Sequence, residues 1–161
     1  MKLAFVFPGQ GSQSVGMMAA YAGLAQIDAT MAAADVALAS PLTALIASGP
    51  AEELAVTTTT QPAMLAADVA VWNAWVAAGG PAPSMVAGHS LGEYAALVAA
   101  GVLNFDAAMK LVKARSQAMQ DAVPAGVGGM AAVLGIGPGP LAEVCEKASQ
   151  GEVVSCCNLN A

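Results

Sequence analysis

The feature that most restricts how this chain can fold is a glycine–serine–glycine turn between two apolar segments. Ser84–Ala87 predicts a short buried strand, and Glu93–Ala100 predicts a helix. Gly88, Ser90 and Gly92 stand between them at alternate positions. A serine at such a junction lies on a strained turn that exposes its hydroxyl. The pattern therefore predicts that Ser90 lies on a strand-to-helix turn, at the carboxyl end of the strand.

Two interpretations of this turn are open. Ser90 and Glu93 have the spacing of a capping box, which stabilises a helix start and needs no chemistry. Alternatively, Ser90 is a nucleophile, and the backbone N–H of Leu91 donates to an oxyanion with help from the helix dipole. The strand before the turn and the helix after it favour the second interpretation.

A second glycine-rich loop, Pro8–Gln13, follows the apolar run Leu3–Phe7, which predicts a buried parallel strand. The loop lacks the lysine of a phosphate-binding P-loop and is not a dinucleotide-binding fingerprint. It is either a turn that requires glycine or a source of a second N–H donor to the oxyanion. Ligands bind at this end of the strands in parallel sheets.

The charge balance excludes some classes of function. Five Lys and Arg residues stand against eleven Asp and Glu, a net charge of −6, which argues against a nucleic-acid partner. A chain that is 57% hydrophobic and 10% charged is not disordered. Three cysteines and one histidine suggest neither a disulfide framework nor a metal site.

The long uncharged windows predict no membrane span. Leu3–Ile27, Val69–Gly92 and Ala122–Ala142 are each interrupted by Gly and Pro, whereas a spanning helix needs about 20 apolar residues. The first apolar run is also shorter than the ~7–15 residues of a signal-peptide core. We therefore expect a cytoplasmic protein with reduced cysteines.

The chain divides into two expected units. Residues 1–124 form a large subdomain, and residues 125–161 are the start of a smaller one. The smaller one opens with the flexible hinge Gly126–Gly129. In the smaller unit, Met130–Ile136 and Val153–Cys157 predict strands that flank a helix over Pro140–Ser149.

Helices are also expected in the larger unit, at Met17–Leu24, Asp28–Leu38, Pro41–Ser48 and Phe105–Asp121. Asn104 is expected to cap the last of these. A further helix is expected to start after a threonine cap in Thr57–Thr60, with Pro62 in its first turn, and to run through Trp72.

Several motifs together carry a family resemblance. They are Phe7–Gln13, Thr60–Ala63, Gly88–Tyr94, Lys113–Ser116, Gly128–Ala132 and Asn158–Asn160. In order and spacing the chain resembles malonyl-CoA:acyl carrier protein transacylase from end to end. The resemblance implies an α/β-hydrolase-like parallel sheet core with an inserted ferredoxin-like small subdomain, both incomplete in this chain.

The resemblance also implies a reaction and its residues. A serine takes malonyl from coenzyme A and passes it to the phosphopantetheine thiol of acyl carrier protein, in fatty acid or polyketide synthesis. Ser90 would be the nucleophile, and the amides of Gln10 and Leu91 would form the oxyanion hole. Arg115 would bind the malonyl carboxylate, and Gln61 would line the pocket. No permanent cofactor and no metal are implied, since the coenzyme A thioester is a substrate.

The chain departs from the family in one respect. The family's base is a histidine far downstream, and the only histidine here is His89. Adjacent side chains diverge at a tight turn, so we expect His89 to be structural or pocket-lining. The sequence therefore resembles about half of an enzyme, and we expect weak or no activity unless the missing half is supplied as a second chain.

Other possibilities stay open. A serine esterase or thioesterase would use the same turn but would not need Arg115, and a non-catalytic fragment would need no nucleophile. Without the resemblance, Arg115 would be expected on an exposed face, paired with Asp106 or Asp121. Met119 is either an acyl-pocket residue or a core residue.

Overall fold

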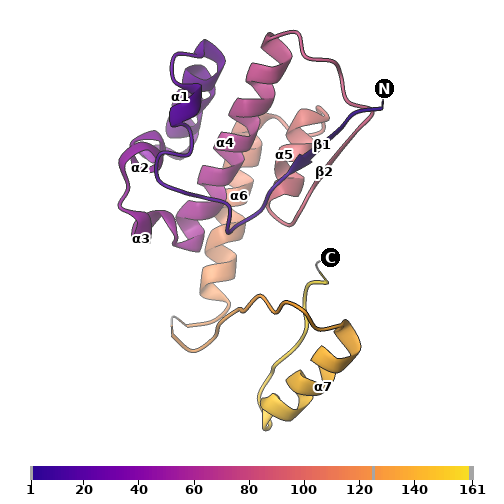
Figure 1. The fold of residues 1–161 in the computed structure, drawn as a ribbon. Helices are drawn as coiled ribbons and strands as arrows, with labels where there is room; N and C mark the ends of the chain where they lie inside the picture. Colours follow the sequence, from indigo (N-terminus) through magenta and orange to yellow (C-terminus); the bar gives the residue numbers. More distant parts are fainter. Residues whose placement is uncertain (1, 125, 160–161) are drawn as a thin grey trace. The chain divides into compact units, whose positions relative to one another are not determined.

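The computed structural model describes residues 2–124 and 126–159, and it divides into two compact units, residues 1–125 and 126–161. The first unit begins with strand β1 (Ala4–Phe7), the short 3-10 helix η1 (Ala19–Tyr21) and helices α1 (Ala25–Leu38), α2 (Leu42–Ser48) and α3 (Ala51–Leu54). It continues with α4 (Thr57–Ala77), strand β2 (Met85–Gly88), α5 (Gly92–Ala99) and α6 (Phe105–Asp121) (Figure 1). The second unit contains α7 (Pro138–Ser149).

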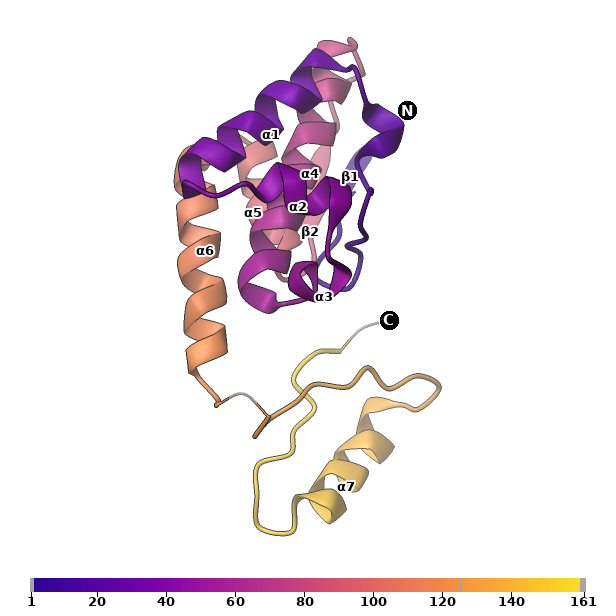
Figure 2. The same cartoon turned by 90° about the vertical axis from the view of Figure 1, so that its left-hand side faces the viewer.

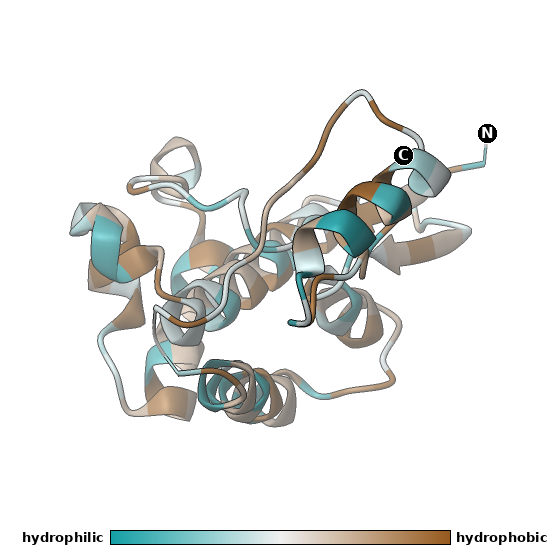
Figure 3. Cartoon of the chain, turned by 90° about the horizontal axis from the view of Figure 1, so that it is seen from below, coloured by the Kyte–Doolittle hydropathy of each residue, from teal (hydrophilic) through white to brown (hydrophobic). Residues whose placement is uncertain are grey.

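Helix α4 passes through the middle of the first unit, and α1, α2, α3, α5 and α6 all contact it (Figures 1 and 2). Every residue from Thr60 to Ala67 is buried, so the helix is covered on all sides in this stretch. Its small and aliphatic side chains pack with Ile46, Leu91 and Met109 into one core. The apolar composition is visible along the ribbons of Figure 3, where pale and brown residues predominate.

The two strands pair in parallel, with Ala4 opposite Met85 and Phe7 opposite Gly88. One face of this sheet packs against the helices through Phe5, whose ring lies 5.1 Å from that of Trp72. The other face is open, because Val6 is 72% and Met85 is 63% exposed. The register aligns the ends of the two strands, which places the loop after β1 beside the turn after β2.

Several local expectations are confirmed. Helix α6 spans the expected residues, and the side chain of Asn104 caps it by accepting from the amide of Ala107 at 2.8 Å. Strand β1 begins one residue later than expected, and β2 ends at Gly88.

The expected start of α4 is wrong. The threonines lie inside the helix, whose N-cap is Val56 with no side-chain cap bond. Pro62 therefore stands beyond the first turn, and the expected threonine cap does not form. The expected helix Met17–Leu24 is also wrong, because only the short η1 forms between Gly16 and Gly23, which both have positive φ.

The smaller unit forms a helix but no strand within the residues that the structure describes. Met130–Ile136 and Val153–Cys157 are irregular, in contrast to the sequence expectation. Leu134 is 89% and Val153 is 95% exposed, so neither segment has a packing surface. Isolated strands are unstable without a neighbour to satisfy their backbone groups, which explains the difference.

No helix in the described ranges is long and apolar enough to cross a bilayer.

Candidate functional site

Ser90 occupies a strained turn between β2 and α5. Its φ is +52°, a left-handed conformation that is uncommon for a residue other than glycine. A Cβ on Gly92 would lie 2.2 Å from the carbonyl oxygen of Phe7, and a Cβ on Gly88 would lie 2.0 Å from the carbonyl carbon of Gly92. Both flanking glycines are thus required by close backbone approach, which leaves Ser90 exposed at the surface.

The capping-box interpretation of Ser90 is wrong in this structure. The N-cap of α5 is Leu91, and no side chain caps the helix. The amide of Glu93 donates to the backbone carbonyl of Ser90 at 3.2 Å, so the serine hydroxyl is not used by the helix start.

The Ser90 hydroxyl contacts Arg115 instead. Nη2 of Arg115 donates to Oγ of Ser90 at 3.0 Å, and the guanidinium carbon lies 5.7 Å from the ring centre of Tyr94. Arg115 comes from the middle of α6 and is the only arginine in the sequence. The chain thus places its one guanidinium directly at the serine.

The alternative partners of Arg115 are engaged elsewhere. Asp106 forms an ion pair with Lys110 at 2.8 Å, and Asp121 accepts from Gln117 at 2.8 Å. The interpretation of Arg115 as a surface residue paired with an aspartate of its own helix is therefore wrong.

Gln61 lies beside Arg115 and is fully buried. Its Oε1 accepts from Nη1 of Arg115, and its Nε2 donates to Oγ1 of Thr57 at 2.9 Å. Nε2 also lies 3.4 Å from the sulfur of Met119, which places that methionine, 44% exposed, next to the site. Gln61 is therefore a neighbour of the guanidinium, and Met119 contacts Gln61.

Sequence reasoning missed Thr57. Its hydroxyl donates to Oε1 of Gln10 at 3.1 Å while it accepts from Gln61. The spacing of Thr57 and Gln61 by four residues in one helix was the available signal, since such residues lie on one helix face. Through Thr57, the loop after β1 is connected to α4.

The loop that carries Gln10 also approaches the turn of Ser90 directly. A Cβ on Gly9 would lie 2.8 Å from the carbonyl oxygen of His89 and 3.4 Å from its Nδ1. The amide of His89 donates to the carbonyl of Phe7 at 3.2 Å. Gly9 is thus required where the two loops meet, and the imidazole of His89 packs against the glycine-rich loop.

The structure therefore brings four predicted residues into one hydrogen-bonded series, from Gln10 through Thr57, Gln61 and Arg115 to Ser90. Leu91, the fifth predicted residue, has a buried side chain and directly follows the serine. Such a site presents a serine hydroxyl, a permanent cation and backbone amides, which suits an acyl group with a negative charge.

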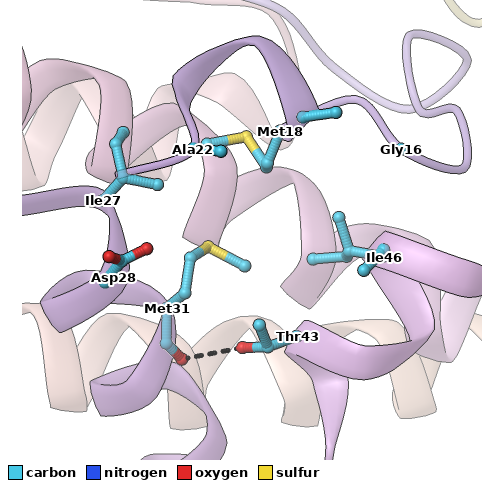
Figure 4. Close-up of a pocket in the computed structure, with 10 residues that line it drawn as sticks. Gly16, Met18, Ala22, Ile27, Asp28, Met31, Thr43 and Ile46 are labelled. Atoms are coloured by element: carbon cyan, nitrogen blue, oxygen red, sulfur yellow. Dashed lines mark hydrogen bonds between the residues drawn. The ribbon is translucent and has the colours of Figure 1, made fainter. Parts of the chain in front are cut away.

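One cavity of the first unit lies away from these residues. It measures about 200 Å³ and is bounded by η1, α1 and α2, where Met18, Ile27, Met31 and Ile46 converge (Figure 4). The hydroxyl of Thr43 donates to the carbonyl of Met31 at 3.2 Å at one side of it. None of the predicted site residues lines this cavity.

One carboxyl group has a strongly altered protonation. Burial raises the pKa of Asp68 from 3.8 to about 7, because the charged form loses its hydration. Its Oδ2 is buried and has no hydrogen-bond partner within the described residues.

Cys145, Cys156 and Cys157 are free thiols, and the described residues contain no cluster of side chains suited to a metal.

Comparison with known proteins identifies the family. A model of the acyl transferase domain matches residues 4–160. The malonyl CoA-acyl carrier protein transacylase of Salmonella typhimurium is 53% identical over 161 residues, which cover 99% of this chain and 52% of the relative. The chain thus spans about half the length of the curated relatives it matches.

Solved structures agree. An acyl carrier protein S-malonyltransferase from Vibrio cholerae superimposes with a TM-score of 0.91 at 52% identity, over 99% of this chain and 53% of that one. A malonyl-transacylase in complex with its type II PKS acyl-carrier protein gives a TM-score of 0.91 at 47% identity, over 95% of this chain and 50% of that one. The fold is the acyltransferase fold of these structures, and the chain belongs to the acyl transferase domain family.

Proposed function

We propose that this chain provides the nucleophile-bearing half of a malonyl-CoA:acyl carrier protein transacylase. The observation that carries the proposal is the contact between the only guanidinium of the chain and the Ser90 hydroxyl, 3.0 Å apart. A malonyl group has its thioester carbonyl and its free carboxylate separated by one methylene. A site that joins a nucleophile to a cation matches that spacing.

In the proposed reaction, Oγ of Ser90 attacks the thioester carbonyl, and the C–S bond breaks to release coenzyme A. The phosphopantetheine thiol of acyl carrier protein then attacks the malonyl-serine ester and restores the hydroxyl. Among the described residues, the amides of Gln10 and Leu91 donate no hydrogen bond, so both are available for the oxyanion of each step. Each such donor contributes about 10²–10³ in rate.

Arg115 is proposed to bind the malonyl carboxylate, because a guanidinium stays charged and can form two parallel hydrogen bonds. Gln61 is proposed to line the pocket and hold Arg115. The reaction needs no metal and no resident cofactor, since the coenzyme A thioester is itself the substrate.

We further propose that residues 1–124 belong to an α/β-hydrolase-like subdomain and residues 125–161 to an inserted ferredoxin-like subdomain. Each unit would be completed by a segment outside this sequence, either joined to it or present as a second chain. Two observations support this: the relatives are about twice as long, and the sheet face with Val6 and Met85 is uncovered. The general base would come from that segment, and the assembled protein would act in the cytoplasm.

The test is acylation of Ser90, followed by mass spectrometry of the intact protein. The chain, alone and mixed with the second half of a relative, is incubated with malonyl-CoA or acetyl-CoA. We expect a malonyl adduct that is lost in Ser90→Ala, and a preference for malonyl over acetyl that is lost in Arg115→Ala. Arg115→Lys is expected to restore little of it, because the ammonium lacks the planar fork of donors.

The same experiment separates the alternatives. A serine esterase or thioesterase for neutral acyl groups would accept acetyl as readily as malonyl, and Arg115→Ala would leave the ratio of the two reactions unchanged. A non-catalytic fragment would give no adduct on Ser90 even with the second half present. Either result would rule out the proposed function.

A further inference from the structure

We propose that Thr57 is a positioning residue that fixes the orientation of the Arg115 guanidinium and thereby the preference for carboxylated acyl groups. This role is inferred from its contacts with Gln10 and Gln61, at 3.1 and 2.9 Å. The link to selectivity depends on the proposed function, whereas the effect on Arg115 does not.

The directions of the hydrogen bonds around Thr57 determine how the Gln61 amide is turned. A hydroxyl has one proton to donate. Thr57 donates that proton to Oε1 of Gln10, which as a carbonyl oxygen can only accept. The Thr57 oxygen can then only accept from Gln61, so the amide of Gln61 must turn its NH₂ group toward Thr57.

That orientation determines what Arg115 meets. With Nε2 of Gln61 directed at Thr57, Oε1 is directed at Nη1 of Arg115. The reverse orientation would place the NH₂ group against a guanidinium that can only donate, and neither would have a partner. Gln61 is fully buried, so water cannot replace the lost bonds, and the site strongly favours one orientation.

The position of the guanidinium follows from this restraint. Nη1 is held by Gln61, and Nη2 reaches Oγ of Ser90 at 3.0 Å. A carboxylate that binds the same edge of the guanidinium therefore lies next to the nucleophile. Thr57 touches neither the serine nor the acyl group in this scheme and acts only through Gln61.

The experiment uses the fact that the sequence contains one arginine. In a ¹⁵N–¹H spectrum of the labelled chain at mildly acidic pH, its Nε–H gives a single arginine resonance that needs no assignment. We expect Thr57→Val to move or broaden this resonance in the free protein, and Thr57→Ser to leave it in place because the hydroxyl is kept. Thr59→Val is the matched control, since it makes the same change one half-turn further along α4.

Gln10→Met provides a second, independent variant. It removes the acceptor of the Thr57 proton, so the hydroxyl is free to rotate, and its restraint on the NH₂ group of Gln61 weakens. It keeps the backbone N–H of residue 10. We expect the arginine resonance to move in Gln10→Met as well, and an unchanged resonance in Thr57→Val or in Gln10→Met would overturn the proposal. An equal change in Thr59→Val would also overturn it, since the effect would then not be specific to Thr57.

Titration with malonyl-CoA and acetyl-CoA then measures selectivity. In Thr57→Val we expect the ratio of the dissociation constant for acetyl-CoA to that for malonyl-CoA to fall about tenfold toward unity. A change of this size corresponds to the loss of one hydrogen bond in a charged network. Failure of the proposed function would give a different result, in which the wild-type arginine resonance does not respond to malonyl-CoA. The comparison of the free proteins would still decide the role of Thr57.

Discussion

The carboxyl group of Asp68 is placed in the core helix α4 without a partner for its buried Oδ2 among the described residues. Folding raises its pKa from 3.8 to about 7, so the folded chain retains a proton that the unfolded chain loses above pH 4. The contribution of Asp68 to the free energy of unfolding therefore decreases as the pH rises from about 4 to 7, and it stays low above pH 7.

We expect Asp68→Asn to change the free energy of unfolding more favourably at pH 8 than at pH 4, by about 2 kcal/mol. This value is smaller than the full pKa shift would give, because the side chain is partly exposed and solvent screens its charge. Urea unfolding at the two pH values measures the difference. Asp28→Asn, on an exposed part of α1, is the control and should change little between the two. If the effect of Asp68→Asn were the same at both pH values, its carboxyl group would not be the cause.

The residues of the candidate site were largely predictable from the sequence, because each is marked by a local pattern. Ser90 has flanking glycines, Gln10 stands in a glycine-rich loop, and Arg115 is the only arginine. The spacing of Thr57 and Gln61 places both on one helix face, but it does not reveal what Thr57 does. Its role depends on which amide orientation it imposes on Gln61, and only the three-dimensional contacts of both side chains reveal that.

At the scale of elements, the departure of α4 from its expected start has an energetic consequence. Pro62 lies inside the helix and has no N–H, so the carbonyl of Thr58, four residues earlier, lacks its usual partner. Nζ of Lys113 on α6 donates to that carbonyl at 3.2 Å. One lysine thus compensates for the proline and joins α4 to α6.

We expect Lys113→Met to lower the free energy of unfolding by about 1 kcal/mol, the contribution of one such hydrogen bond. Lys110→Met is the control on the same helix. Its ion pair with Asp106 is exposed, so its loss should cost less than about 0.5 kcal/mol. Urea denaturation measures the free energy of unfolding of both variants. An equal decrease in both would show that the hydrogen bond to Thr58 does not stabilise the chain more than the exposed ion pair does.

The elements that the sequence predicted well are those determined by their own residues. Helix α6 has a side-chain cap and an amphipathic pattern, and its bounds were correct. The segments Met130–Ile136 and Val153–Cys157 have strand composition, yet they form no strand here. Strand formation depends on a neighbour that supplies hydrogen bonds, and composition cannot say whether that neighbour is present.

At the scale of the whole molecule, one face of the β1–β2 sheet is apolar and uncovered. Val6 and Met85 are mostly exposed on it, although a two-stranded sheet needs further packing for stability. The relatives of about twice the length provide additional chain that could cover this face. We expect the complementary half to bind there.

We expect Val6→Glu to prevent co-purification of this chain with the separately expressed second half of the Salmonella typhimurium relative. The charge would be buried without a partner in that interface. Val36→Glu is the matched control, since Val36 is 82% exposed on α1, away from the sheet. Loss of binding in both variants, or in neither, would contradict this location of the interface.

The parallel register of β1 and β2 also limits which insertions and deletions the chain can tolerate. Phe7 pairs with Gly88, and the loop residue Gln10 and the turn residue Leu91 each follow three residues later. A shift of one residue between the strands would displace these two amides by about 3.3 Å and would turn Phe5 and Phe7 toward solvent. Length changes between Ala4 and Gln10 should therefore be selected against more strongly than most substitutions there. A pairing of four residues, too short to be stable alone, thus sets the distance between the two amides of the proposed oxyanion hole.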